Sequence, residues 1–148
     1  MPEVREGVFA VIYKKNPLRF LIVKNARTQK YSFVSGMKEE KETLDNTLKR
    51  EVKEEVGLDI STIRKTGVYH QFPYEGTNDI GMEKVYLIEV KPDAEIQKGD
   101  VLDALWVSED QLKMYFEVDR PGILATFKKV RNLIQTEINT GLYQLNRF

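Results

Sequence analysis

The segment from Gly36 to Leu58 constrains the fold of this chain most, because its apolar residues repeat with the period of an α-helix. They stand four positions apart, at Leu44, Leu48, Val52 and Val56. Thr43 suits the N-cap position in front of them, and Gly57 suits the position that ends a helix. The spacing therefore predicts one amphipathic helix between Thr43 and Gly57, with its apolar face packed on the rest of the protein.

The same segment carries seven acidic residues, which are Glu39, Glu40, Glu42, Asp45, Glu51, Glu54 and Glu55. At about 100° per residue, Glu55 falls inside the apolar stripe, and Glu51 and Glu54 converge on the same side. Arg50 and the neighbouring lysines project from other sides, so a carboxylate buried here is costly unless a bound cation compensates it. Carboxylate oxygens select a hard ion such as Mg²⁺ or Mn²⁺. Because substrate phosphates commonly complete a Mg²⁺ site, we expect a phosphorylated substrate.

Short β-branched and aromatic runs on both sides of this helix predict strands, at Val8–Tyr13, Leu18–Val23, Tyr31–Val34, Thr66–Phe72, Val85–Val90 and Ala104–Val107. A turn at Asn16-Pro17 joins the first two runs into a hairpin. Ser108 and Gln111 predict a capping box for a short helix. The apolar spacing after Pro121 predicts a long amphipathic helix that ends at Gly141. Strands interleaved with helices predict an α/β fold, and 148 residues suit a single domain, 1–148.

Composition excludes several kinds of site and partner. Twenty-three basic residues balance 23 acidic ones, so no overall positive field favours nucleic acid or an anionic membrane. The chain has no cysteine and only one histidine, His70, which excludes disulfides, thiolate nucleophiles and the common zinc sites. The N-terminal segment has only a short apolar run, so we expect no signal peptide, no membrane span and a cytoplasmic location.

The charged segment resembles the Nudix box, a pattern of glycines, glutamates and one arginine at fixed intervals. Every fixed position is occupied, by Gly36, Glu42, Arg50, Glu51, Val52, Glu54, Glu55, Gly57 and Leu58. The resemblance implies the family's α/β/α sandwich, a mixed β-sheet with this helix and the long C-terminal helix packed on it. It also implies Mg²⁺-dependent hydrolysis, with Mn²⁺ as a substitute, of a nucleoside diphosphate linked to another moiety. Lys41 occupies a position where glycine is frequent in the family, so the loop backbone would be strained if its φ is positive.

The resemblance also implies roles for individual residues. Glu51, Glu54 and Glu55 would bind the metal together with the carbonyl oxygen of Gly36. Arg50 would brace the preceding loop and the metal carboxylates through charge-assisted hydrogen bonds.

In some branches of the family the general base is an acid a few residues before a tryptophan. Asp100 has the better-matching distance from Trp106, and Asp103 is the second candidate. Asp100 could equally be a turn residue after Gly99. Glu51 is the rival base.

Candidates for substrate binding lie outside the box, at Tyr31, Phe33, His70, Phe72 and Lys84. Aromatic faces can stack on a base for about 1–3 kcal/mol each. Aromatic residues on strands are also common core residues, which is the structural alternative for each of them. Lys84 stands where related dinucleoside polyphosphate hydrolases have a phosphate-facing lysine, although a surface lysine is common anywhere.

Two substrate classes compete. The stretch from Tyr31 through the box is similar to nucleoside triphosphate pyrophosphohydrolases, which release pyrophosphate from a (deoxy)nucleoside triphosphate. The stretch from Glu83 to Val107 is similar to asymmetric diadenosine tetraphosphate hydrolases instead. We prefer the first class and keep the second as the alternative.

Two other interpretations do not involve catalysis. One is a Nudix module that binds a nucleotide without turnover, but such modules usually lose box glutamates and this chain keeps them all. The other is a solvated helix whose acids pair with lysines and bind no metal. The expected partner is a nucleotide substrate and not a nucleic acid, and a homodimer is left open because many relatives are dimers.

Overall fold

The computed structural model describes residues 2–60 and 62–146, and the side chains of its last helix as far as residue 134. The elements in chain order are β1 (Val4–Lys14), β2 (Arg19–Lys24), β3 (Tyr31–Ser32), β4 (Val34–Met37), α1 (Leu44–Val56), β5 (Arg64–Pro73), β6 (Ile80–Glu89), β7 (Asp103–Val107), α2 (Glu109–Phe116) and α3 (Pro121–Asn146). The strands form one mixed sheet in the order β3-β2-β1-β6-β5, with β4 paired to β1 and β7 to β2. Only the central pair, β1 and β6, is parallel among these pairings.

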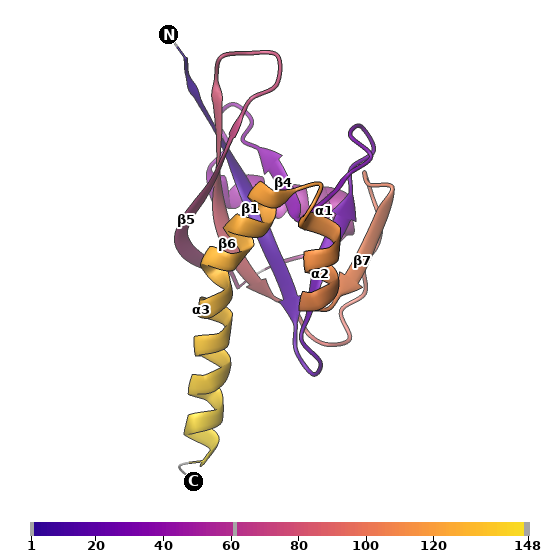
Figure 1. Ribbon diagram of the computed structural model, residues 1–148, viewed down its shortest axis with the longest axis vertical. Coiled ribbons are helices and arrows are strands. Elements are labelled where there is room, and N and C mark those ends of the chain that lie inside the picture. The colour runs from indigo at the N-terminus through magenta and orange to yellow at the C-terminus, as the bar shows by residue number, and fades with distance from the viewer. Residues whose placement is uncertain (1, 61, 147–148) are drawn as a thin grey trace.

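Helices cover both faces of this sheet. Figure 1 shows α2 and α3 on one face and α1 on the other. Along β1, Phe9 and Val11 belong to the core under α2 and α3, whereas Val8 and Ala10 belong to the core under α1. This period-2 alternation explains the nearly continuous apolar run, because both faces of β1 are buried. The α/β/α sandwich predicted from the sequence is therefore confirmed. Among the described residues, none of the helices has the length and apolar character needed to cross a membrane.

The local signals in the sequence mark the helix ends correctly. Thr43 is the N-cap of α1 and its side chain accepts a hydrogen bond from the Asn46 backbone N–H. Gly57 ends the helix in the left-handed conformation with φ of 71°, which costs glycine little. Ser108 and Gln111 form the predicted capping box of α2.

Several predicted boundaries are wrong. Strand β1 begins at Val4 instead of Val8. The run Tyr31–Val34 is split at Phe33, because β3 pairs with β2 while β4 pairs with β1. Strand β6 begins at Ile80 instead of Val85, since its polar first half is held between β1 and β5. Helix α3 continues past Gly141 to Asn146. A glycine inside a helix costs only about 1 kcal/mol relative to alanine, which does not oblige the helix to end.

Candidate active site

Gly36 brings the end of β4 against the acidic side of α1. A Cβ atom at this position would overlap the carboxyl group of Glu51. Only a residue without a side chain lets the Glu51 carboxylate approach the backbone here. The glycine required by the motif therefore has a direct steric reason.

Arg50 connects α1 to the loop in front of it. Its Nε donates to Glu42 Oε2 at 2.7 Å and its Nη2 to Glu42 Oε1 at 2.9 Å. Its Nη1 donates to Glu51 Oε1 at 2.8 Å, and Nη2 also reaches the Met37 carbonyl oxygen at 3.2 Å. This bidentate pair lowers the pKa of Glu42 to about 2, mainly through the Arg50 hydrogen bond. These contacts are those expected of a bracing residue.

The expectation that no cation reaches the acidic side of the helix is wrong. Arg50 does project from another side at its Cα, but its long side chain bends back to Glu51. It also lies 3.4 Å from Glu54. Arg50 divides its donors among Glu42, Glu51, Glu54 and the Met37 carbonyl oxygen, so several carboxylates share this one side chain.

The loop before α1 is strained at Lys41. Its φ is 68°, a conformation that costs a residue with a side chain about 1–3 kcal/mol. Glu42 offsets this cost by accepting hydrogen bonds from the Glu39 backbone N–H at 2.8 Å and the Thr47 hydroxyl at 3.1 Å. The loop thus keeps its shape without the glycine that is frequent at this position.

Glu55 is the carboxylate that most requires a cation. Among the described residues its Oε2 is buried and has no hydrogen-bond partner. Burial raises the pKa of Glu55 to about 9, and Glu51 and Glu54 act in the same direction. Burial also raises the pKa of Glu51. A divalent cation beside these residues would supply the missing partner and remove the repulsion.

The donor set of oxygens therefore fits a hard divalent cation. Glu54, whose side chain is 47% exposed, lies at the open side of the set. As the side chains stand, no three acids or histidines in the described parts of the chain already surround a common point.

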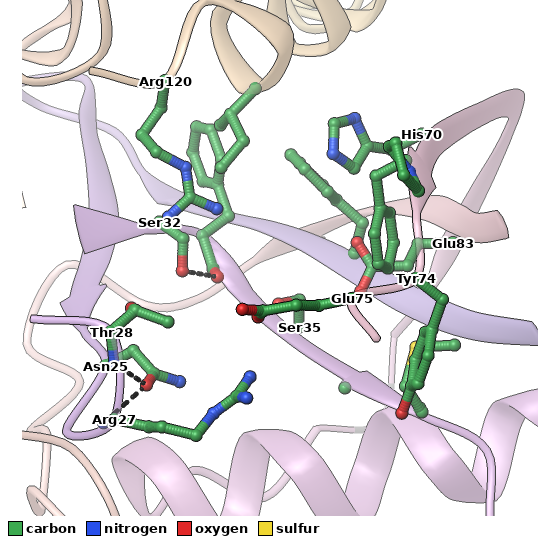
Figure 2. Close-up of a pocket in the computed structure, with 17 residues that line it drawn as sticks. Asn25, Arg27, Thr28, Ser32, Ser35, His70, Tyr74, Glu75, Glu83 and Arg120 are labelled. Carbon is green, nitrogen blue, oxygen red and sulfur yellow. Dashed lines mark hydrogen bonds between the residues drawn. The ribbon is translucent and has the colours of Figure 1, made fainter. Parts of the chain in front are cut away.

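A cavity of about 420 Å³ opens on the opposite side of the sheet, beneath the start of α3. Aromatic residues of two strands and two connecting positions line it, namely Phe9, Phe33, His70, Phe72 and Tyr74. In Figure 2, Arg120 and Ser32 lie on one side of this pocket and His70 and Tyr74 on the other. Gly36 also lines the pocket, so the pocket and the carboxylate site share a wall.

His70 is hydrogen-bonded to α3 from inside this pocket. Its Nδ1 lies 2.8 Å from Thr126 Oγ1, and the tautomer of the ring decides which of the two donates. Thr126 Oγ1 also lies 3.0 Å from the Gly122 carbonyl oxygen. Burial lowers the pKa of His70, and the positive charges of Arg120 and Lys129 contribute, which favours the neutral ring.

The structure brings together three of the five residues singled out for substrate binding. Phe33, His70 and Phe72 line the pocket, although Phe33 is 0% exposed and also packs in the core. Tyr31 is not in the lining and instead donates its hydroxyl to Asp103 at 3.1 Å. Lys84 alternates with Val85 on β6 and so faces away from the pocket, with its ammonium 5.9 Å from the Tyr86 ring.

Asp100 lies at the carboxyl end of α1. Its backbone N–H donates to the Glu54 carbonyl oxygen at 3.0 Å, and that of Gly99 donates to Glu55 at 3.0 Å. The loop is therefore fastened to the helix that carries the three glutamates. The side chain of Asp100 is exposed, whereas Asp103, the second candidate base, accepts the Tyr31 hydroxyl.

Sequence reasoning missed most of the other pocket residues, and Glu83 and Arg120 are the charged ones among them that are not exposed. Glu83 is 6% exposed, and its burial raises its pKa to about 8. Extending the alternation of Val85 and Leu87 backwards along β6 would have placed Glu83 on the pocket face. Arg120 stands directly before α3, and no local signal in the sequence marks it as a pocket residue.

Comparison with known proteins agrees with this architecture. The model of the NUDIX domain family matches residues 3–127. The E. coli dihydroneopterin triphosphate pyrophosphohydrolase is similar in structure, at 21% identity and TM-score 0.73 over 86% of this chain and 95% of that one. So is a C. elegans Ap4A hydrolase binary complex, at 15% identity and TM-score 0.73 over 89% and 98%.

The NUDIX domain of Shewanella oneidensis NrtR, complexed with ADP ribose, is similar at 16% identity and TM-score 0.70 over 90% and 89%. At these identities the likeness to solved structures shows the fold. No curated protein matches the sequence significantly.

Proposed function

This chain belongs to the Nudix family of pyrophosphohydrolases, and from that premise we propose that it releases pyrophosphate from a (deoxy)nucleoside triphosphate. The supporting observation is the shared wall at Gly36. A nucleoside held in the aromatic pocket would direct its phosphates past Gly36 to the carboxylates of α1. The pocket volume of about 420 Å³ is suited to one nucleoside.

The cofactor of this proposal is Mg²⁺, with Mn²⁺ as a substitute, held by Glu51, Glu54, Glu55 and the Gly36 carbonyl oxygen. When bound, the ion supplies charge for the phosphate oxygens and a more acidic water. Its support is the buried, unpartnered Oε2 of Glu55.

The chain itself would contribute positioning and proton transfer. Arg50 holds Glu51 against Gly36 and holds Glu42 in the loop. Asp100 or Glu51 would accept the proton of the attacking water, and water would form the new bond to phosphorus as pyrophosphate leaves. Asp100 is supported by the backbone hydrogen bond that fastens its loop to α1.

Phe33, His70 and Phe72 would contact the nucleoside. For Tyr31 and Lys84 a substrate contact stays a prediction that their present positions do not support. The single domain 1–148, the cytoplasmic location and the homodimer also stay predictions.

A panel of substrates tests the proposal. (Deoxy)nucleoside triphosphates, diadenosine tetraphosphate and ADP ribose are incubated with Mg²⁺, and the products are identified. Pyrophosphate from a triphosphate supports the proposal, provided that Glu54→Gln abolishes its release. ATP from diadenosine tetraphosphate would instead assign the alternative substrate, the one named for the C. elegans structure. Stable binding without turnover would indicate a nucleotide-binding module.

A further inference from the structure

Glu83 is an ionisable residue in an unfavourable place. It is only 6% exposed, and within the described residues its carboxyl group makes no hydrogen bond and no ion pair. A buried carboxylate without a partner is strongly destabilising, so such a group usually marks a place where something else binds. Arg120 acts on Glu83 with a positive charge, but the two side chains do not form an ion pair.

Two sheet positions beside Glu83 are glycines and have no side chain. In the register of the sheet, Gly7 of β1 lies between Met37 of β4 and Glu83 of β6. A Cβ atom on Gly7 would lie 2.6 Å from the Gly36 carbonyl oxygen and 3.3 Å from Cγ of Glu83. Gly7 has the parity of Phe9, so its missing side chain leaves the pocket face to Glu83 and to Met37, whose Sδ would lie 2.8 Å from that Cβ.

Gly36 leaves room on the other face. It has the parity of Val34, which packs under α1, and the Glu51 carboxyl group occupies the position of its absent side chain. Glu83 on the pocket face and Glu51 on the helix face therefore flank a place where Gly7 and Gly36 carry no side chains of their own, with the Met37 side chain beside Gly7. The Gly36 carbonyl oxygen lies at this place.

Three oxygen-bearing groups surround this place. They are the Gly36 carbonyl oxygen, the Glu51 carboxyl group and the Glu83 carboxyl group, whose Cγ would lie 3.3 Å from a Cβ on Gly7. Every one of these groups is an oxygen acceptor, and a hard cation is the partner that satisfies them together.

We propose that Glu83 is a further ligand of the divalent-cation site, contributed by β6 from the pocket face of the sheet beside the Gly36 carbonyl oxygen, where Gly7 and Gly36 carry no side chains. This inference rests on the proposed function, because it takes α1 as the main holder of the cation. It extends that site to the strand that also forms the pocket. Occupancy by the cation is then linked to the shape of the nucleoside pocket.

Direct binding of Mn²⁺ to the substrate-free protein tests this inference. Free Mn²⁺ is measured by electron paramagnetic resonance for the wild type and for Glu83→Gln. We expect the variant to bind Mn²⁺ at least about tenfold more weakly, or to lose one ion per chain. Without metal, Glu83→Gln should melt at the wild-type temperature or above it, because it removes a buried ionisable group that has no partner. Addition of Mg²⁺ should raise the melting temperature of Glu83→Gln by less than it raises that of the wild type.

The matched control is Glu75→Gln, an acid that lines the same pocket but is exposed. Its Mn²⁺ binding should equal that of the wild type. If Glu83→Gln does not fold, Glu83→Asp keeps the charge on a shorter side chain. Glu83→Asp should then also bind Mn²⁺ more weakly than Glu75→Gln.

The outcomes separate this inference from the function on which it rests. Wild-type Mn²⁺ affinity in Glu83→Gln, together with weak binding in Glu54→Gln, would overturn the role of Glu83 and leave the proposed function intact. Unchanged Mn²⁺ binding with a raised KM would overturn it too, and would make Glu83 a substrate contact. A wild type that binds no Mn²⁺ would overturn both.

Discussion

The two halves of the site, on opposite faces of the same sheet, are built in different ways. The carboxylate half is built mainly by one continuous segment, Gly36 to Glu55, in which a loop and one helix hold all the glutamates of the motif. The pocket half is assembled from β1, β4, β5, β6 and the start of α3, segments far apart in the chain. The metal-binding residues of a continuous segment can be predicted from their spacing in the sequence. The residues of a pocket assembled from distant segments can be identified only when the fold is known.

The largest expected effect tests whether the carboxylate half depends on its backbone. Gly36→Ala would push the Glu51 carboxyl group away from the backbone. We expect kcat to fall by about 10³-fold, because loss of a cation ligand removes several kcal/mol of charge stabilisation. Gly122→Ala is the control, since a Cβ there meets only His70 Cε1 at 3.8 Å. Near-normal turnover in Gly36→Ala would show that Glu51 works from another position.

The next largest effect tests whether the general base is Glu51 on α1 or Asp100 in the loop that is hydrogen-bonded to α1. Asp100→Asn should lower kcat by at least about 10²-fold if Asp100 takes the proton, a usual contribution of general-base catalysis. Asp103→Asn should leave kcat near the wild-type value. Unchanged turnover in both variants would remove this region from the chemistry and leave Glu51 as the base.

A smaller effect is expected in the pocket half. Phe72→Ala removes a ring that lines the pocket, and stacking on a base is worth about 1–3 kcal/mol. KM should rise by about tenfold while kcat changes little, as expected for loss of uniform binding. Tyr31→Phe is the control outside the lining. If kcat falls instead of KM rising, the pocket takes part in the chemical step and the two halves are not separable.

The smallest effect concerns stability in acid. The Arg50 hydrogen bonds lower the pKa of Glu42 from 4.5 to about 2. The stabilisation of the folded state by ionised Glu42 is therefore complete above pH 4.5 and is lost as the pH falls towards 2. Glu42→Gln should melt below the wild type at pH 7, and this difference should shrink between pH 4.5 and 2. A difference in melting temperature that stays constant over this range would mean that the Glu42 charge contributes nothing.

The sequence was most informative where structure is decided locally. Thr43, Gly57 and Ser108 act on their own neighbours, so their capping roles could be predicted. The position of Glu55 could be predicted too, because helical geometry alone sets it. Predictions failed where a distant partner decides the outcome. Arg50 bends back to Glu51, and β6 begins at Ile80 because β1 and β5 hold it.

The same distinction explains the substrate residues. Phe33, His70 and Phe72 could be chosen by residue type, yet only the sheet shows that they share a pocket. Lys84 was predicted to face the substrate because of its position in the sequence. Its alternation with Val85 on β6 puts it on the sheet face opposite the pocket. A shift of one residue reverses the face of a strand residue, so position along the chain alone cannot decide it.

The backbone bonds between the end of α1 and the following loop have a consequence for local opening. The N–H groups of Gln97, Gly99 and Asp100 donate to the carbonyl oxygens of Val56, Glu55 and Glu54. Release of the loop and fraying of the last helical turn must break the same three bonds. These amides should therefore exchange with deuterium as one unit, at a rate set by the end of α1.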